Sequence, residues 1–227
     1  MMQGKVLIVT GALGALGKVV AETALARGAR VAGIDHAPSQ ISAMPERIEI
    51  GGVDLSDAAQ AKTAVEAAAR HFGGLDVLVN IAGGFAFETV GDGDVKTWQR
   101  MHALNVLTAL NASQAALPHL AASKAGRIVN IGAMGALQAG SGMGPYAASK
   151  AGVHRLTEAL ASEWKGKVTV NAVLPSIIDT KANRADMPKA DFAKWVTPQE
   201  LAEVILFLAS DAASGVTGAL IPVGGRV

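Results

Sequence analysis

An apolar run joined to three closely spaced glycines opens the chain at Val6-Leu7-Ile8-Val9-Thr10-Gly11-Ala12-Leu13-Gly14-Ala15-Leu16-Gly17. The run Val6–Thr10 is continuous and rich in β-branched residues, which predicts a strand buried on both faces. The three glycines permit a tight turn into a helix, which the periodicity predicts over Ala15–Arg27. A cleavable signal peptide has no use for these glycines, so we interpret the stretch as a strand, a turn and a helix.

The same alternation of strand and helix continues along the chain. Further apolar, β-branched runs lie at Arg30–Asp35, Arg47–Ile50, Asp76–Ile81, Arg127–Ile131, Val168–Leu174 and Ala219–Val223. Alanine-rich stretches of helical period lie at Ala58–Phe72, Val95–Ala122, Pro145–Trp164 and Pro198–Ala209. Strands without polar alternation are typical of a parallel sheet that helices cover on both sides. The predicted fold class is α/β, a single doubly wound Rossmann domain over residues 1–227.

One segment, residues 176–196, interrupts this order because it shows no clear periodicity. It is too short for a domain and long for a plain connection. It follows Pro175 and mixes charged residues with Met187, Phe192 and Trp195. We expect an inserted loop that covers the substrate.

Composition and charge exclude several classes of protein. Of the 227 residues, 50% are apolar and 17% are charged, as in a globular protein with a large core. The 20 basic residues nearly balance the 19 acidic ones, so no overall field attracts nucleic acid or anionic lipid. The chain has no cysteine, which excludes disulfides and thiolate metal sites, and no run of about 18 apolar residues that would span a membrane. We expect a cytoplasmic protein without nucleic-acid or membrane partners.

The glycine turn is a candidate binding site for a dinucleotide. Backbone amides and the helix dipole favour a pyrophosphate there, and we expect contacts from Gly11, Leu13, Gly14, Ala15, Leu16 and Gly17. Asp35 ends the second predicted strand, 18 residues beyond Gly17. An acid there suits the ribose hydroxyls of NAD and repels the 2′-phosphate of NADP, so NAD(H) is favoured and NADP(H) is the alternative. The competing interpretations are an ordinary turn and a surface-loop acid.

Two further stretches follow strands at the same edge of the predicted sheet. Asp54 and Leu55 follow the third strand and could contact the adenine, although an acid before a helix could also cap it. Asn80, Ala82 and Gly83 close the fourth strand, at the carboxyl edge where doubly wound sheets bind ligands. Asn80 could equally be a structural amide that ties two strands together, and the two roles are compatible.

Tyr146 and Lys150 place a phenol and an ammonium one helical turn apart, on the same side of a helix. A phenol with its ordinary pKa of about 10 is a poor acid–base group at neutral pH. The positive charges of Lys150 and of a nicotinamide ring would favour the phenolate and lower that pKa. Tyr146 is also the only tyrosine in the chain. We therefore expect Tyr146 to be the catalytic acid–base group, the alternative being the start of an ordinary amphipathic helix.

Several motifs of the chain occur together in one known family. They are the turn at residues 10–17, Asp54, Asn80-Ile81-Ala82-Gly83, Asn105, Gly126–Ile131, Tyr146 with Lys150, and Asn171-Ala172-Val173-Leu174-Pro175 with Thr180. With them the chain resembles the short-chain dehydrogenases/reductases over essentially all of its length. The resemblance implies a seven-stranded parallel sheet and hydride transfer to or from a nicotinamide. It further implies that Lys150 binds the ribose and that Asn105 holds a water in a proton relay. Its last implication is a frame around the carboxamide made by Pro175, Ile178 and Thr180.

Two departures from the common family pattern are informative. Ala15 stands where that pattern has a further glycine, and Ala133 stands thirteen residues before the tyrosine, where the family has its catalytic serine. Both departures resemble the dihydropteridine reductase branch, which has an aromatic residue near the pterin at the place of Phe85. A quinonoid pterin delocalises charge over its ring and needs a second hydrogen-bond donor less than a ketone does. Asn105 matches the ordinary branch better. We expect Ala133 and Phe85 to lie beside the substrate.

Three functions follow as expectations. The first is an NAD(P)H-dependent oxidoreductase that transfers hydride to a small cyclic substrate, similar to a dihydropteridine reductase, and its alternative is a carbonyl or 3-oxoacyl-thioester reductase. The third is a catalytically silent nucleotide-binding regulatory protein, against which the retention of Asn105, Tyr146 and Lys150 argues. The five histidines lack metal-ligand spacing, so no metal is expected. Family members associate through helices that are alanine-rich here, which implies a homodimer or homotetramer.

Overall fold

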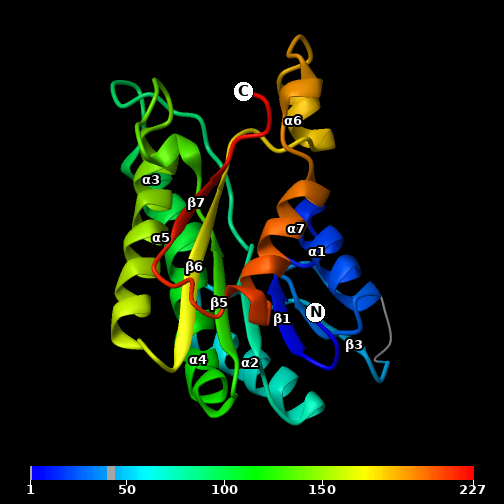
Figure 1. Cartoon of the computed structure of the whole chain (residues 1–227). Coiled ribbons are helices and arrows are strands. Elements are labelled where there is room, and N and C mark those ends of the chain that lie inside the picture. The colour runs from blue at the N-terminus through cyan, green and yellow to red at the C-terminus, as the bar shows by residue number, and fades with distance from the viewer. Residues whose placement is uncertain (1, 40–43) are drawn as a thin grey trace.

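Seven parallel strands form one sheet in the order β3-β2-β1-β4-β5-β6-β7 (Figure 1). The computed structural model describes residues 2–39 and 44–227 of the chain. The strands are β1 (Val6–Thr10), β2 (Arg30–Ile34), β3 (Arg47–Ile50), β4 (Val77–Asn80), β5 (Gly126–Ile131), β6 (Val168–Pro175) and β7 (Leu220–Val223). The helices are α1 (Ala15–Ala26), α2 (Ala58–Phe72), α3 (Val95–His102), α4 (Thr108–Ala122), α5 (Gly144–Glu163), α6 (Lys181–Asp186) and α7 (Pro198–Leu208). The predicted fold class and the seven-stranded sheet are confirmed.

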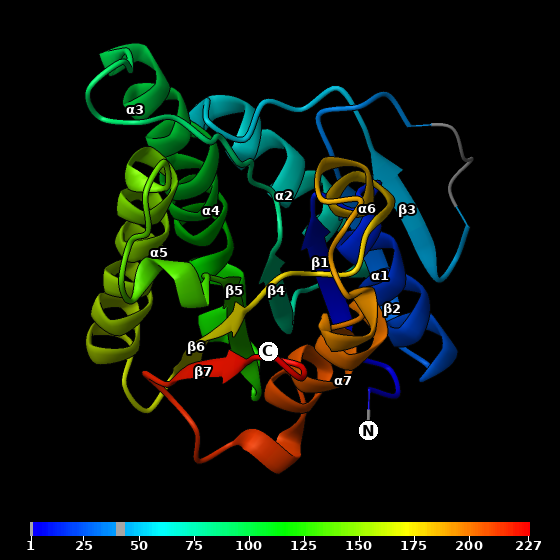
Figure 2. The same ribbon diagram turned by 90° about the horizontal axis from the view of Figure 1, so that it is seen from above.

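Helices cover both faces of the sheet and enclose two separate cores (Figure 2). On one face α1 and α7 pack together, and Leu7 of β1 belongs to their core. On the other face lie α2, α4 and α5, and the next residue of β1, Ile8, belongs to that core. Neighbouring residues of a strand point to opposite faces, so a strand covered on both sides needs apolar residues at every position. This explains the uninterrupted apolar runs.

Two regions differ from the elements predicted by periodicity. The single helix expected over Val95–Ala122 is divided by a π-helical segment, Ala103–Leu107, between α3 and α4. The segment 176–196, expected as a loop, contains α6 and a short 3₁₀ turn, and a parallel bridge between Ile178 and Val196 closes its base. Figure 1 shows α6 beyond the carboxyl ends of the strands. The insertion therefore lies at the edge of the sheet where doubly wound folds bind their ligands.

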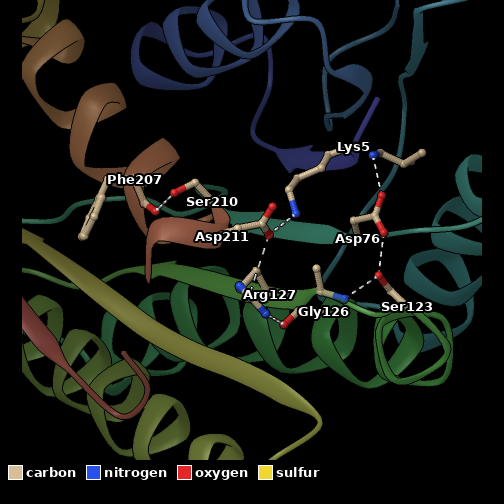
Figure 3. Close-up of polar contacts among 10 residues, drawn as sticks. Lys5, Asp76, Ser123, Gly126, Arg127, Phe207, Ser210 and Asp211 are labelled. Carbon is tan, nitrogen blue, oxygen red and sulfur yellow. Dashed lines mark hydrogen bonds and ion pairs between the residues drawn. The ribbon is translucent and has the colours of Figure 1, made fainter. Parts of the chain in front are cut away.

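A polar cluster joins the amino ends of three strands, at the opposite edge of the sheet (Figure 3). Asp76, just before β4, accepts hydrogen bonds from the first amide of β1 (2.9 Å) and from the Ser123 hydroxyl (2.6 Å). Lys5, just before β1, donates to the Asp211 carboxylate at 2.8 Å, and the Arg127 guanidinium lies 4.0 Å from the same carboxylate. These contacts fix the ends of β1, β4 and β5 that face away from the glycine turn.

Candidate active site

The glycine turn connects the carboxyl end of β1 to α1 by close backbone packing. Gly11 has a φ of +64°, and a Cβ there would lie 2.9 Å from the amide nitrogen of Ala82. A Cβ on Gly17 would lie 2.0 Å from the carbonyl oxygen of Gly11. Any side chain at these two positions would push β1, α1 and the end of β4 apart, so the turn requires glycine.

The turn fits the pyrophosphate of a nicotinamide dinucleotide. Gly14 begins α1 without a side-chain cap, and no acidic residue occupies the first helical turn. The first amides of a helix have no partner within it, so those of Ala15, Leu16 and Gly17 are available to an anion. The side chain of Leu16 is buried in the core, which leaves its backbone amide for the cofactor.

Asp35 lies against this turn. Its carboxylate accepts hydrogen bonds from the backbone amides of Leu13 (2.8 Å) and Ala37 (2.9 Å). These two bonds hold the half-buried carboxylate at the end of β2, where the sequence predicts the ribose hydroxyls.

Asp54 and Leu55 lie after β3, and the structure gives them different roles. Asp54 accepts from the amide (2.9 Å) and the hydroxyl (2.7 Å) of Ser56, and these bonds lower the pKa of its carboxyl. The cap of α2 is Asp57, whose side chain accepts from the amides at the helix start, so Asp54 is not the helix cap. The Leu55 side chain is buried in the core, so only its backbone faces outward.

Asn80 has the structural role that was one of its two interpretations. Its buried amide donates to Asn130 of β5 (2.9 Å) and to a serine hydroxyl of α4 (3.1 Å). Ala82 donates its backbone amide to the Thr10 hydroxyl at 3.1 Å, which fixes this stretch to β1. Gly83 is exposed, and a Cβ there would lie 2.5 Å from the side-chain oxygen of Asn105. Gly83 thus lies where the predicted nucleotide end of the site meets its predicted catalytic end.

The predicted catalytic pair, Tyr146 and Lys150, lies near the start of α5, which follows the carboxyl end of β5. The Lys150 ammonium, on a residue that is 7% exposed, donates a 2.8 Å hydrogen bond to the Ile131 carbonyl. A Cβ on Gly83 would lie 3.5 Å from this nitrogen, so the ammonium faces the end of β4. The Tyr146 ring meets the half-exposed Phe85 ring edge-on, with 5.0 Å between centroids. Phe85 therefore forms one wall beside the phenol.

Burial governs the pKa values of this pair. It raises the pKa of Tyr146 to about 12 and lowers the pKa of Lys150 to about 8. The sequence predicted that Lys150 and a nicotinamide ring together would lower the pKa of the phenol; among the protein's own groups, burial is the cause that shifts this pKa, and it raises it. The phenol is therefore protonated at neutral pH, which is the state of a proton donor.

Asn105 lies in the π-helical segment and is 1% exposed. Its amide nitrogen donates to the Gly84 carbonyl (3.0 Å) and to the Ser149 hydroxyl (2.9 Å), and its oxygen accepts from the Gly84 amide (3.0 Å). Ser149 in turn donates to the Tyr146 carbonyl at 2.7 Å. Sequence reasoning missed Ser149, whose signal was its place beside Lys150 on the buried side of α5. π-Helical segments often occur at functional sites, and this one carries the predicted site residue Asn105.

Ala133 lies just after β5, is 5% exposed and brings a methyl group where the resemblance implies a hydroxyl. Its backbone amide donates to Nε2 of His154 at 3.3 Å. His154 is a second residue that sequence reasoning missed. Burial, with Arg155 and Lys150 nearby, lowers the pKa of this imidazole and favours the neutral form that accepts the bond.

The residues expected around the carboxamide lie between β6 and α6. Pro175 is the last residue of β6, and Ile178 forms the bridge to Val196. The Thr180 hydroxyl accepts from the amide of Asn183 at 3.1 Å and caps α6. All three lie at the base of the insertion, close to the carboxyl end of β6.

Two kinds of feature are absent from the part of the chain that the structure describes. No three His, Asp or Glu side chains gather there as a set that could hold a metal ion. Within the same residues, no helix combines the length and the apolar character needed to cross a membrane.

Comparison with known proteins gives consistent relatives. The profile of the family described as short chain dehydrogenase matches residues 5–191. A 3-oxoacyl-(acyl-carrier-protein) reductase of Thermotoga maritima is 32% identical over 240 residues, covering 99% of this chain and 98% of that one. A D-threitol dehydrogenase of Mycolicibacterium smegmatis is 31% identical, with coverages of 99% and 93%. The structure of carveol dehydrogenase from Mycobacterium avium in complex with NAD superposes with a TM-score of 0.86, at 26% identity and coverages of 98% and 97%.

Proposed function

This chain belongs to the short-chain dehydrogenase/reductase family, and from that premise we propose that it is an NAD(H)-preferring carbonyl reductase with Tyr146 as proton donor. Membership makes the chain an oxidoreductase that uses a nicotinamide cofactor. The observation that carries the proposal is the convergence of a protonated phenol, a buried ammonium and a buried amide at the end of β5, beside an uncapped helix N-terminus.

The nicotinamide cofactor, when bound, supplies or accepts the hydride. The side chains of this protein donate the proton and stabilise the charge that its transfer leaves behind. Tyr146 donates its phenolic proton to the substrate oxygen as negative charge develops there. Lys150, held by the Ile131 carbonyl, places a positive charge one helical turn from the phenol and stabilises the phenolate that forms. Asn105 and Ser149 fix the first turn of α5 and so orient Tyr146.

NAD preference rests on Asp35. A 2′-phosphate would bring negative charge against a carboxylate that two backbone amides hold at the turn, whereas ribose hydroxyls can donate to it. A hydrogen bond to a charged group contributes roughly 1.5–3 kcal/mol, on the order of 10- to 100-fold in efficiency. Equal efficiencies with NADH and NADPH would contradict the preference.

The names of the relatives favour a carbonyl or secondary-alcohol substrate. One relative is named for a 3-oxoacyl group, which contains a ketone. Another is named for D-threitol, which carries hydroxyl groups. The dihydropteridine-type reaction is the second candidate. It is favoured by the methyl group of Ala133, which offers no hydroxyl donor, and by the ring of Phe85 beside Tyr146.

Steady-state rates with NADH separate the two candidates. We expect faster turnover on a 3-oxoacyl thioester or simple ketone than on a quinonoid dihydropterin. Removing a general acid costs about 100- to 10,000-fold, so Tyr146→Phe should lose most ketone turnover and still bind NADH. Loss of one oxyanion donor costs roughly 100- to 1,000-fold in other enzymes, so Ala133→Ser should raise ketone turnover. A faster pterin reaction that Tyr146→Phe leaves intact would favour the second candidate.

A further inference from the structure

A second carboxylate lies beside the glycine turn, on the neighbouring strand. Glu49 of β3 lines the same narrow pocket as Leu13 of the turn and Asp35 of β2. Only Asp35 stands at the position that the turn motif assigns to the ribose. Glu49 comes from the outermost strand and is brought there by the pairing of β2 with β3.

A glycine in β2 gives Glu49 its path to the turn. Gly33 is paired with Glu49, so both positions face the same side of the sheet. A Cβ on Gly33 would lie 3.5 Å from Cγ of Glu49 and 2.8 Å from Cβ of Ala12. Without that glycine a side chain would stand between β3 and the turn. The Glu49 side chain therefore crosses β2 to reach the pocket.

The Glu49 carboxylate is ion-paired in a poorly exposed place. Arg47, two residues earlier on the same face of β3, donates to it at 2.6 Å. The side chain of Glu49 is 7% exposed, against 29% for Arg47. The pair is thus shielded at its acidic end, and its guanidinium is held in place by the carboxylate.

We propose that Glu49 is a second determinant of cofactor choice, acting with Asp35 to exclude the 2′-phosphate of NADP(H). The inference rests on the proposed function, because it assumes that the adenosine ribose lies at Asp35. Asp35, Glu49 and Arg47 together carry one net negative charge. Their carboxylates repel a phosphate that carries close to two negative charges. Glu49 also keeps Arg47 engaged, so that its guanidinium is withheld from the phosphate.

Nucleotide binding by the full-length protein tests this without turnover. Titration calorimetry with adenosine 2′,5′-bisphosphate and with 5′-AMP gives a ratio of affinities that isolates the 2′-phosphate. Glu49→Gln is nearly isosteric and should shift this ratio by about 10-fold toward the bisphosphate, the size expected for one charge-assisted contact. Glu46→Gln removes the same charge from an exposed residue just before β3 and should leave the ratio unchanged.

Two further variants separate repulsion from the release of Arg47. Arg47→Met leaves both carboxylates in place and should shift the ratio against the bisphosphate. The double variant Glu49→Gln with Arg47→Met should show little of the shift toward the bisphosphate that Glu49→Gln produces alone. Thermal unfolding of each variant shows whether it is folded before the affinities are compared.

The outcomes distinguish this inference from the proposed function. If Asp35→Ser changes the ratio of affinities but Glu49→Gln does not, the role of Glu49 is overturned. The nucleotide site at Asp35 is then retained. Shifts of equal size for Glu49→Gln and Glu46→Gln would reduce the effect to a general surface charge and also overturn it. Wild-type protein that binds neither 5′-AMP nor NADH would instead contradict the proposed function.

Discussion

Lys150 holds a positive charge in a place where it is 7% exposed, bonded to the Ile131 carbonyl. Its ammonium lies one helical turn from the Tyr146 phenol and faces Gly83, where the nucleotide end of the site begins. Burial disfavours the ammonium and lowers its pKa to about 8. The residue therefore gives the site its charge at a cost in folding stability.

That cost predicts how stability changes with pH. The ordinary pKa of a lysine is 10.5, so between pH 8 and 10 the unfolded chain binds more protons than the folded one. The free energy of unfolding contributed by Lys150 therefore rises with pH in this window. The melting temperature of the wild type, relative to Lys150→Met, should increase from pH 7.5 to 9.5. A constant difference would contradict the lowered pKa.

At higher pH the phenol of Tyr146 makes the free energy of unfolding fall as the pH rises. This sets the upper pH limit of the measurement. Its pKa is raised from 10.0 to about 12, so the stability contributed by the neutral phenol is present below pH 10. This contribution is lost as the pH rises from 10 through 12, because the unfolded chain releases its proton first. Below pH 9.5 the lysine effect is thus observed by itself.

The common face of Tyr146 and Lys150 could be predicted from their spacing because residues four apart adjoin on a helix. The pKa values of the pair could not. They depend on how deeply β5, the end of β4 and the π-helical segment bury α5, and these segments lie 15 to 70 residues away in the sequence. The depth of burial, and with it the raised pKa of the phenol, could be read only from the fold.

At the scale of elements, α5 is joined to the π-helical segment by a short hydrogen-bonded chain. Asn105 donates to Ser149, and Ser149 donates to the Tyr146 carbonyl. These two hydrogen bonds connect the segment that follows α3 to the first turn of α5, which carries Tyr146. The position of the phenol thus depends on a hydroxyl that does not touch it.

Ser149→Ala should lower both stability and turnover. A lost buried hydrogen bond destabilises by about 1 kcal/mol, and urea unfolding measures it. We expect kcat to fall more than KM rises, because the variant loosens Tyr146 and leaves the substrate walls unchanged. Ser141→Ala, at an exposed position before α5, is the matched control and should change neither quantity. If Ser149→Ala kept the kcat of the wild type, the hydrogen bonds from Asn105 through Ser149 to Tyr146 would have no role in catalysis.

The insertion at 176–196 is bonded mainly at its base. Ile178 is bridged to Val196, and the backbone amide of Arg226 donates to the Lys194 carbonyl at 2.8 Å. Above this base Arg184 forms a two-pronged ion pair with Asp179. We expect α6 to move as one unit and close over substrate.

Limited trypsin digestion tests closure of the insertion. Lys181 and Arg184 are exposed on α6, and NADH should slow cleavage there several-fold if the insertion closes. Cleavage after Lys62, on the distant α2, provides an internal control and should keep its rate. Identical cleavage at α6 with and without NADH would identify a permanently packed segment.

Periodicity predicts the ends of most elements correctly but says nothing of two features that shape the site. The π-helical segment Ala103–Leu107 has a normal helical composition, and its packing against α5, with Asn105 donating to Ser149, is a contact between residues far apart in the sequence. Likewise α6 has six residues, too few for a periodic signal. Both features depend on contacts across the fold.

At the scale of the whole molecule, exposed apolar side chains gather along α3 and the π-helical segment that follows it. Val95, Trp98 and Leu104 are each more than one third exposed, and Ala148 is an exposed small residue on the neighbouring α5. Small residues allow helices to approach closely, so this side of the protein suits association with a second copy. We propose a homodimer or homotetramer formed through it.

Light scattering after size exclusion should therefore give a mass of two or four chains. Ala148→Glu places a charge on the proposed contact and should reduce the mass toward a single chain. Ala59→Glu adds the same charge at an exposed position of α2 and should leave the mass unchanged. A wild-type monomer, or equal effects of the two variants, would rule out this surface.

The family resemblance predicted a parallel sheet of seven strands, whereas the order of those strands became known only from the structure, since periodicity alone gives strands without their neighbours. The position of Tyr146 and Lys150 after the fifth predicted strand followed from the sequence itself, and in the structure both lie in α5, which follows β5. The resemblance gave no indication that Glu49 crosses β2 to the glycine turn, because that path depends on the register between β2 and β3 and on Gly33. Side chains brought together by register are visible only in three dimensions.

The two cores on either side of the sheet make the molecule modular for redesign. Val20 and Leu201 share one core, whereas Val65 belongs to the other. Substitutions far apart without shared neighbours add within roughly 0.5 kcal/mol, so truncating Val20 and Val65 together should show no epistasis, while Val20 and Leu201 should. Away from the glycine turn, the α1 and α7 layer can therefore be repacked without changing the packing of the opposite layer, to which α5 with Tyr146 and Lys150 belongs.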